Sequence, residues 1–182
     1  SSSEESQKRS TLGAILTLTS PGIPMLFQGQ EFLENGWFDD KDPTDWSKAT
    51  TYAGITQMYR DLISMRRNGN NNTRGLMGGN VNIFHVNNQD KVIAFHRWDR
   101  GGAGDDVVVV ANFSANWFPA YQIGFPRAGR WQARFNSDWK GYSAKFNDTD
   151  SFDIDAYAGG KDGLTANGTV QVGPYSAVIF SQ

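Results

Sequence analysis

Seven short β-rich runs occupy the second half of the chain, and they restrict its fold more than any other feature of the sequence. Turn-forming dipeptides and glycine clusters separate the runs, as in antiparallel sheets. The predicted strands cover residues 81–86, 92–98, 107–113, 117–123, 131–135, 169–172 and 177–181. Strands at this spacing indicate a mainly β chain with an antiparallel β-sandwich over residues 71–182. The run 107–111 is apolar throughout, which predicts a central strand.

The first 70 residues follow a different pattern, because two helical segments flank a short apolar run. The first helix is predicted over residues 6–20, with Ser3 or Ser6 as its cap and a Pro-Gly pair at its end. The second is predicted over residues 51–67, where apolar side chains recur at helical spacing. The recurring side chains are Ile55, Met58, Tyr59, Leu62 and Ile63. The polar segment 69–73 is predicted to link this part to the sandwich.

The apolar run 23–27 lies between the two helices and leads into a polar and aromatic loop. A short apolar run closed by glycine indicates a strand that is buried on both faces. In barrels of alternating strands and helices, the loops that follow the strands carry the active site. Helix, strand, loop and helix form only a small part of such a barrel. The pattern therefore predicts that residues 1–70 are a fragment of a barrel of this kind rather than a complete domain.

Charge and composition exclude several classes of partner. The formal net charge of −2 argues against nucleic acid and anionic membranes. No run of about 18 apolar residues occurs, so we expect no membrane-spanning segment. The chain has no cysteine, which excludes disulfides and thiolate metal sites. We expect no cofactor and no metal ion.

Motifs in both parts resemble glycoside hydrolase family 13, the α-amylase superfamily. The first part carries SPGIPMLFQGQEF, GWF and a helix that ends in MRR. The second part carries VVVVANFSANWF, YQIGFPRAG and GPYSAVIFSQ. The form GIPMLFQGQEF is similar to that of the 1,4-α-glucan branching enzymes. The resemblance covers nearly the whole chain. It implies that residues 1–70 are the terminal segment of a (β/α)8 catalytic barrel, with its last strand and helices, and that residues 71–182 form an all-β C-terminal domain. It also implies a cytoplasmic enzyme that acts on a glycogen- or starch-type glucan.

The resemblance also implies which catalytic groups this chain lacks. The family uses a retaining mechanism with three carboxylates on earlier barrel strands, and two of them lie about 5 Å apart. Those strands are expected upstream of residue 1. Neither His85 nor His96 is followed by Asp, as the histidine of the family's seventh strand is. We therefore expect no catalytic residue here and no activity from the chain alone.

Five residues are candidates for substrate binding. The resemblance places Gln30, Glu31 and Phe32 at the end of the eighth barrel strand, beside the cleft. The Glu31 carboxylate would accept hydrogen bonds from a sugar hydroxyl, although Gln30 and Glu31 are equally suited to pairing with backbone or with a barrel arginine. Trp37 and Phe38 offer faces on which a glucose ring would stack, or they simply pack the loop.

Two features of the sandwich suggest sites less strongly. Loop 147–153 alternates oxygen-bearing side chains, but it lacks the glycine and final glutamate of a helical calcium loop, which favours an exposed polar loop. Four tryptophans would form a sugar-stacking platform or, as is commoner in a sandwich, anchor the core and the turns. They are Trp98, Trp117, Trp131 and Trp139.

Three functions remain open from the sequence. The first is branching, in which an α-1,4 bond of a glucan is cleaved and the chain is transferred to a 6-hydroxyl. The second is α-amylase-type hydrolysis, and the third is a non-catalytic glucan-binding or docking role. Expected partners are the α-glucan and the remainder of the barrel. Self-association through residues 23–27 is also expected, because an unpaired strand presents open donors and acceptors.

Overall fold

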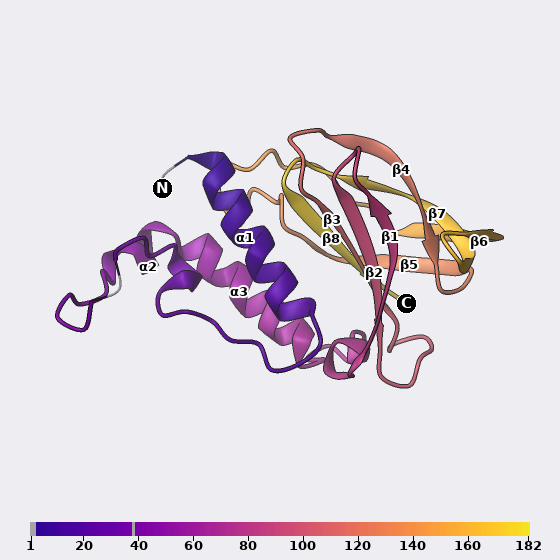
Figure 1. The fold of residues 1–182 in the computed structure, drawn as a ribbon, viewed down its shortest axis with the longest axis horizontal. Helices are drawn as coiled ribbons and strands as arrows, with labels where there is room; N and C mark the ends of the chain where they lie inside the picture. Colours follow the sequence, from indigo (N-terminus) through magenta and orange to yellow (C-terminus); the bar gives the residue numbers. More distant parts are fainter. Residues whose placement is uncertain (1–2, 38) are drawn as a thin grey trace.

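The computed structural model describes residues 3–37 and 39–182. Two long helices lie beside a β-sandwich (Figure 1). The helical elements are α1 (Glu4–Thr19), η1 (Gln30–Phe32), α2 (Ser47–Thr51), α3 (Ala53–Arg66) and η2 (Arg74–Met77). Ser3 caps α1 by accepting a hydrogen bond from the backbone N–H of Ser6, which confirms one of the two predicted caps. Among residues 3–37 and 39–182, no helix has the length and apolar character that a membrane-spanning helix needs.

The second predicted helix is interrupted. Tyr52 has φ −113° and ψ 36°, and it separates the short α2 from α3. The predicted apolar face of α3 is buried except for Ile63, which is 37% exposed at the border of the helix face. Gly54 on α3 lies very close to the β-domain, the part of the chain from residue 80 onward that contains all the strands. A Cβ added to Gly54 would stand 2.3 Å from the carbonyl oxygen of Tyr142. The helices therefore contact the β-domain directly.

The predicted strands are present, and one strand was missed. The strands are β1 (Asn80–Asn87), β2 (Val92–Trp98), β3 (Val107–Asn112), β4 (Phe118–Phe125), β5 (Gly129–Asn136), β6 (Ile154–Lys161), β7 (Leu164–Val172) and β8 (Ser176–Ser181). The missed strand β6 is mostly exposed and contains two glycines, so its apolar alternation is limited to the buried Ile154 and Ala156. Its turn into β7 uses Asp162 and Gly163, both with positive φ, which is the hairpin signal that the sequence did contain.

The eight strands form one continuous antiparallel order, β1-β2-β3-β8-β5-β6-β7-β4. The sandwich arises because this sheet folds over on itself at β5. Residues 132–136 of β5 pair with β8, whereas residues 129–131 pair with β6. As predicted, β3 is a central strand: it is buried along its whole length and lies between β2 and β8.

Alternate side chains of β3 point into two different cores. Val108 and Val110 face the core between the two layers, which also contains Trp131. Val109 faces the other side, where it belongs to the same cluster as Ile15 of α1 and Leu62 of α3. Figure 1 shows α1 and α3 beside the layer that contains β3 and β8. The helices are thus held by apolar packing on the outer face of the sandwich.

The run 23–27 is not a strand, which corrects the sequence-based expectation. It forms an extended segment with no strand partner among the described residues, and Ile23 and Met25 are 99% and 86% exposed. Only Leu26 packs partly against the core that the helices share with the sheet. A strand needs a neighbouring strand to satisfy its backbone groups, and no other described segment pairs with this one in that way. The guanidinium of Arg66 contacts the chain just before it, by donating to the Leu18 carbonyl at 3.1 Å.

Candidate functional site

The candidate residues lie in the loop that joins the extended segment to α2. The side-chain oxygen of Gln30 accepts a hydrogen bond from the Phe27 backbone N–H at 3.2 Å. The backbone oxygen of Glu31 accepts one from the Thr56 hydroxyl at 3.1 Å. Phe32 is only 2% exposed, and its ring centre lies 5.4 Å from that of Trp46. The short helix η1 is therefore fixed by its own turn and by α3.

Trp37 stands at the edge of a hollow of about 510 Å³. Its side chain is 92% exposed, so both faces of the indole are open to a ligand. The carboxylates that line this hollow belong to Glu34, Asp39, Asp40, Asp42 and Asp45. Lys48 provides a positive charge on the same wall. The fifth candidate, Phe38, lies outside the described residues.

Glu34 organises this loop, and the sequence analysis missed it. Its Oε1 accepts hydrogen bonds from the Lys48 ammonium at 2.5 Å and from the backbone N–H groups of Asn35 and Gly36 at 2.8 Å. Its Oε2 accepts the Asp45 N–H at 3.0 Å. The Lys48 bond, followed by the backbone donors, lowers the pKa of Glu34 to about 2. The Asn-Gly pair that follows Glu34 was the available signal for a turn at this position.

A second hollow of about 380 Å³ adjoins the first, and Glu31 and Tyr59 line it. Burial raises the pKa of the Tyr59 hydroxyl to about 12, and the Glu31 carboxylate adds to the rise. Phe27 and Gln28 border both hollows. The structure thus places Glu31 and Trp37 on two adjoining surfaces rather than in a single pocket.

The four tryptophans of the sandwich do not form one platform. Trp131 is fully buried, with its ring centre 5.2 Å from that of Phe125, and Trp98 stacks on His96 at 4.5 Å. Trp117 and Trp139 are about half exposed. Trp131 therefore anchors the core, and the two exposed tryptophans are the ones that a sugar could reach.

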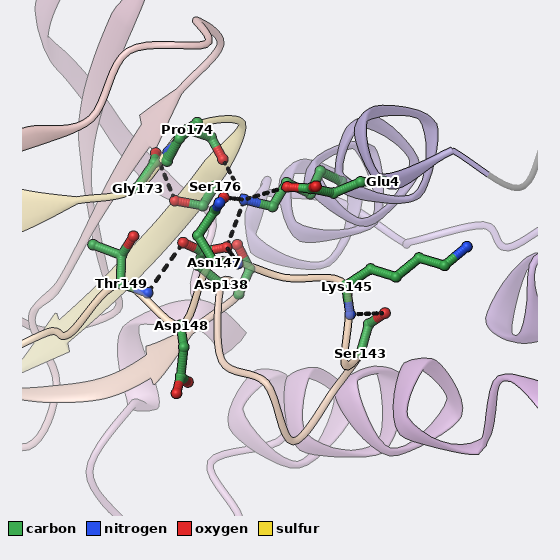
Figure 2. A network of polar contacts seen from close by, with 12 residues as sticks. Glu4, Asp138, Ser143, Lys145, Asn147, Asp148, Thr149, Gly173, Pro174 and Ser176 are labelled. Carbon is green, nitrogen blue, oxygen red and sulfur yellow. Dashed lines mark hydrogen bonds and ion pairs between the residues drawn. The ribbon is translucent and has the colours of Figure 1, made fainter.

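Loop 147–153 is held by a buried carboxylate. The two oxygens of Asp138 accept the backbone N–H groups of Asn147 at 3.1 Å and Thr149 at 3.2 Å, as Figure 2 shows. Within residues 3–37 and 39–182, no three His, Asp or Glu side chains gather closely enough to hold a metal ion. Loop 147–153, with its oxygen-bearing side chains, thus forms an ordered turn around Asp138.

Comparisons with known proteins agree with this architecture. Residues 83–182 match the family described as "Alpha amylase, C-terminal all-beta domain". The 1,4-alpha-glucan branching enzymes GlgB of Corynebacterium diphtheriae and Dechloromonas aromatica are 26% and 28% identical over 171 residues. These alignments cover 88% of this chain but only 22% and 26% of the relatives. The chain thus spans about a quarter or less of the length of these relatives.

Solved structures show the same fold at low sequence identity. A debranching enzyme from Nostoc punctiforme superposes with a TM-score of 0.63 at 16% identity, over 95% of this chain and 31% of that one. An α-amylase from H. orenii gives a TM-score of 0.62 at 17% identity, over 97% and 36%. The fold and the family match define a C-terminal all-β domain of the amylase type, preceded by helices. The chain belongs to glycoside hydrolase family 13, the α-amylase superfamily, as its motifs indicated.

Proposed function

We propose that this chain is the C-terminal part of a 1,4-α-glucan branching enzyme. The observation that carries the proposal is the reach of the similarity to relatives of that name. It covers 88% of the chain and so extends beyond the all-β domain at residues 83–182 into the helical part. The enzyme would cleave an α-1,4 bond, retain the glucan as a covalent intermediate and transfer it to a 6-hydroxyl.

The proposal assigns residues 1–70 to the end of the catalytic barrel and residues 71–182 to the all-β domain. The exposed side chains of Ile23 and Met25 support this, because they are suited to burial against further barrel elements. The catalytic carboxylates would lie in those other elements, so the isolated chain is inactive. Incubated with amylose, it leaves the blue iodine colour unchanged, and loss of colour by the pure chain would overturn the assignment.

In the full-length protein, the assay must separate transfer from hydrolysis. Branching lowers the iodine colour of amylose while the number of reducing ends stays constant, because each cleaved bond is replaced by another. The alternative, α-amylase-type hydrolysis, lowers the colour and raises the number of reducing ends together. The similarity to an α-amylase structure at 17% identity concerns the fold and does not favour hydrolysis.

The candidate residues have distinct roles in this proposal. Trp37, with Phe38, stacks on a glucose ring, and Glu31 with Gln30 forms the adjoining wall of the cleft. Phe32 is buried, so its role is to support the loop. Replacing Trp37 by alanine in the full-length protein is expected to raise KM for amylose about fivefold with little change in kcat, since stacking contacts are each worth about 1 kcal/mol. An unchanged KM would remove Trp37 from the binding site.

The isolated chain is expected to self-associate through the extended segment 23–27 when the rest of the barrel is absent. The exposed Met25 is the side chain to test. Met25→Lys should shift the chain toward monomer in light scattering, because a charge opposes the burial of this surface. Met77→Lys serves as the control, since Met77 is also exposed (61%) but lies in η2. A wild-type chain that is monomeric at high concentration would contradict this expectation.

A further inference from the structure

Trp139 is a half-exposed tryptophan whose ring is held in place from below. An added Cβ on Gly141 would lie 2.3–2.4 Å from three atoms of the indole, so the ring rests directly on the glycine backbone. The ring of Tyr142 meets the indole edge-on, with 5.1 Å between their centres. The Trp139 side chain is nevertheless 52% exposed. One side of the indole is therefore covered by protein, and the other is open to solvent.

Tyr142 is itself fixed, which makes the support rigid. Its hydroxyl donates a hydrogen bond to the Asp61 carboxylate of α3 at 2.7 Å. Its ring stacks on Phe135 of β5, with 5.7 Å between the ring centres. Burial raises the pKa of the Tyr142 hydroxyl, so it remains a donor at neutral pH. Contacts to both α3 and β5 thus fix the orientation of the Trp139 indole.

Polar groups surround a hollow of about 340 Å³ beside this ring. Arg134 donates from Nε to the Ser181 hydroxyl at 3.0 Å, and in the described part of the chain its two Nη groups have no hydrogen bond or ion pair. Asp148 is held by Lys140, whose backbone N–H donates to Oδ1 at 3.0 Å and whose ammonium lies 3.8 Å from Oδ2, but the Asp148 side chain is still 42% exposed. Figure 2 shows that Asp148 points away from the buried Asp138. The hollow therefore offers free guanidinium donors and a partly exposed carboxylate next to an open aromatic face.

We propose that this hollow binds one glucose unit of an α-glucan, at a site on the β-domain that is separate from the barrel loop. The apolar C–H face of the sugar stacks on Trp139, while Arg134 donates to its hydroxyl groups and Asp148 accepts from them. The identity of the glycan as an α-glucan rests on the proposed function. A site of this kind would hold a long glucan on the enzyme while a distant segment of it reacts.

The direct test observes the indole N–H signal of Trp139 in the NMR spectrum of the isotope-labelled chain. Titration with maltoheptaose in the millimolar range should shift this signal, and cellohexaose should shift it much less. Trp117 is equally exposed but does not line the hollow, so its signal should stay fixed. An unmoved Trp139 signal in the wild-type chain overturns the proposal without the need for any variant.

Two variants then test the assigned contacts. Trp139→Ala should weaken binding of maltoheptaose about tenfold, and Arg134→Gln should weaken it several-fold. Trp117→Ala should leave the affinity unchanged. Wild-type affinity in Trp139→Ala would overturn the assignment. A full-length protein that forms no branches while Trp139 still binds maltoheptaose refutes only the proposed function, whereas branching with an unmoved Trp139 signal refutes only this site.

Discussion

Replacing Lys8 by methionine should strongly destabilise this protein. Lys8 lies on α1 and is 2% exposed, and its ammonium stands 2.6 Å from the carboxylate of Asp138 in the β5–β6 loop. It also donates to the side-chain oxygen of Asn147 and to the Pro174 carbonyl, the latter at 3.1 Å. Figure 2 labels the three partners, Asp138, Asn147 and Pro174. One cation thus joins α1 to two loops of the β-domain.

The magnitude follows from the burial of its partner. The Asp138 side chain is 0% exposed, so Lys8→Met leaves a carboxylate without its counter-charge in the protein interior. Removing one partner of such a buried pair costs about 3–5 kcal/mol. The backbone N–H groups that Asp138 accepts from Asn147 and Thr149 remain, which places the expected value near the lower end of that range.

The assay is urea unfolding followed by tryptophan fluorescence. Lys140→Met is the matched control, because the Lys140 side chain is 58% exposed and lies 3.8 Å from Asp148. This control should change the free energy of unfolding by less than about 1 kcal/mol. The double variant Lys8→Met/Asp138→Asn should be more stable than the sum of the two single losses predicts, because it leaves no unpaired charge. A loss below about 1 kcal/mol in Lys8→Met would refute the reasoning.

Two further predictions concern the loop and the helix contact. The pKa of Glu34 is about 2 rather than the ordinary 4.5, so its interactions are fully present above pH 4.5 and are lost as the pH falls through 2. A carboxyl carbon NMR titration of Glu34 should have its midpoint near 2, and a midpoint near 4.5 would contradict the structure. Gly54→Ala should cost about 1–3 kcal/mol, because the new methyl group meets the Tyr142 carbonyl oxygen at 2.3 Å. Gly13→Ala on α1, where nothing lies within 4 Å, should be neutral or stabilising by up to about 1 kcal/mol, and equal losses in both variants would rule out the proposed contact.

Local patterns in the sequence predicted most of the β-domain. The strand at 92–98 was predicted with its observed bounds. The two signals that define it, alternating burial and flanking turns, are both contained in the few residues of the strand and its ends. The run 23–27 has a strand-like composition, but a strand depends on neighbours that its own sequence does not specify. The strand at 154–161 was missed because it buries little apolar surface.

The polar contacts between distant parts of the chain were beyond prediction for a related reason. Lys8 and Asp138 are far apart in the sequence, and nothing local marks either as buried. Glu34 similarly receives its Lys48 partner from the following helix. The motif did indicate that Glu31 and Trp37 belong to the segment that follows the run 23–27. Sequence alone did not reveal that they border two different hollows.

The linkage type of the product tests the central claim most directly. The full-length protein that contains this chain would be incubated with amylose, and the anomeric protons of the product would be followed by NMR together with a count of reducing ends. Branching predicts a growing α-1,6 signal at the expense of α-1,4, with the number of reducing ends constant. A rising number of reducing ends without any α-1,6 signal would contradict the proposal and identify a hydrolase.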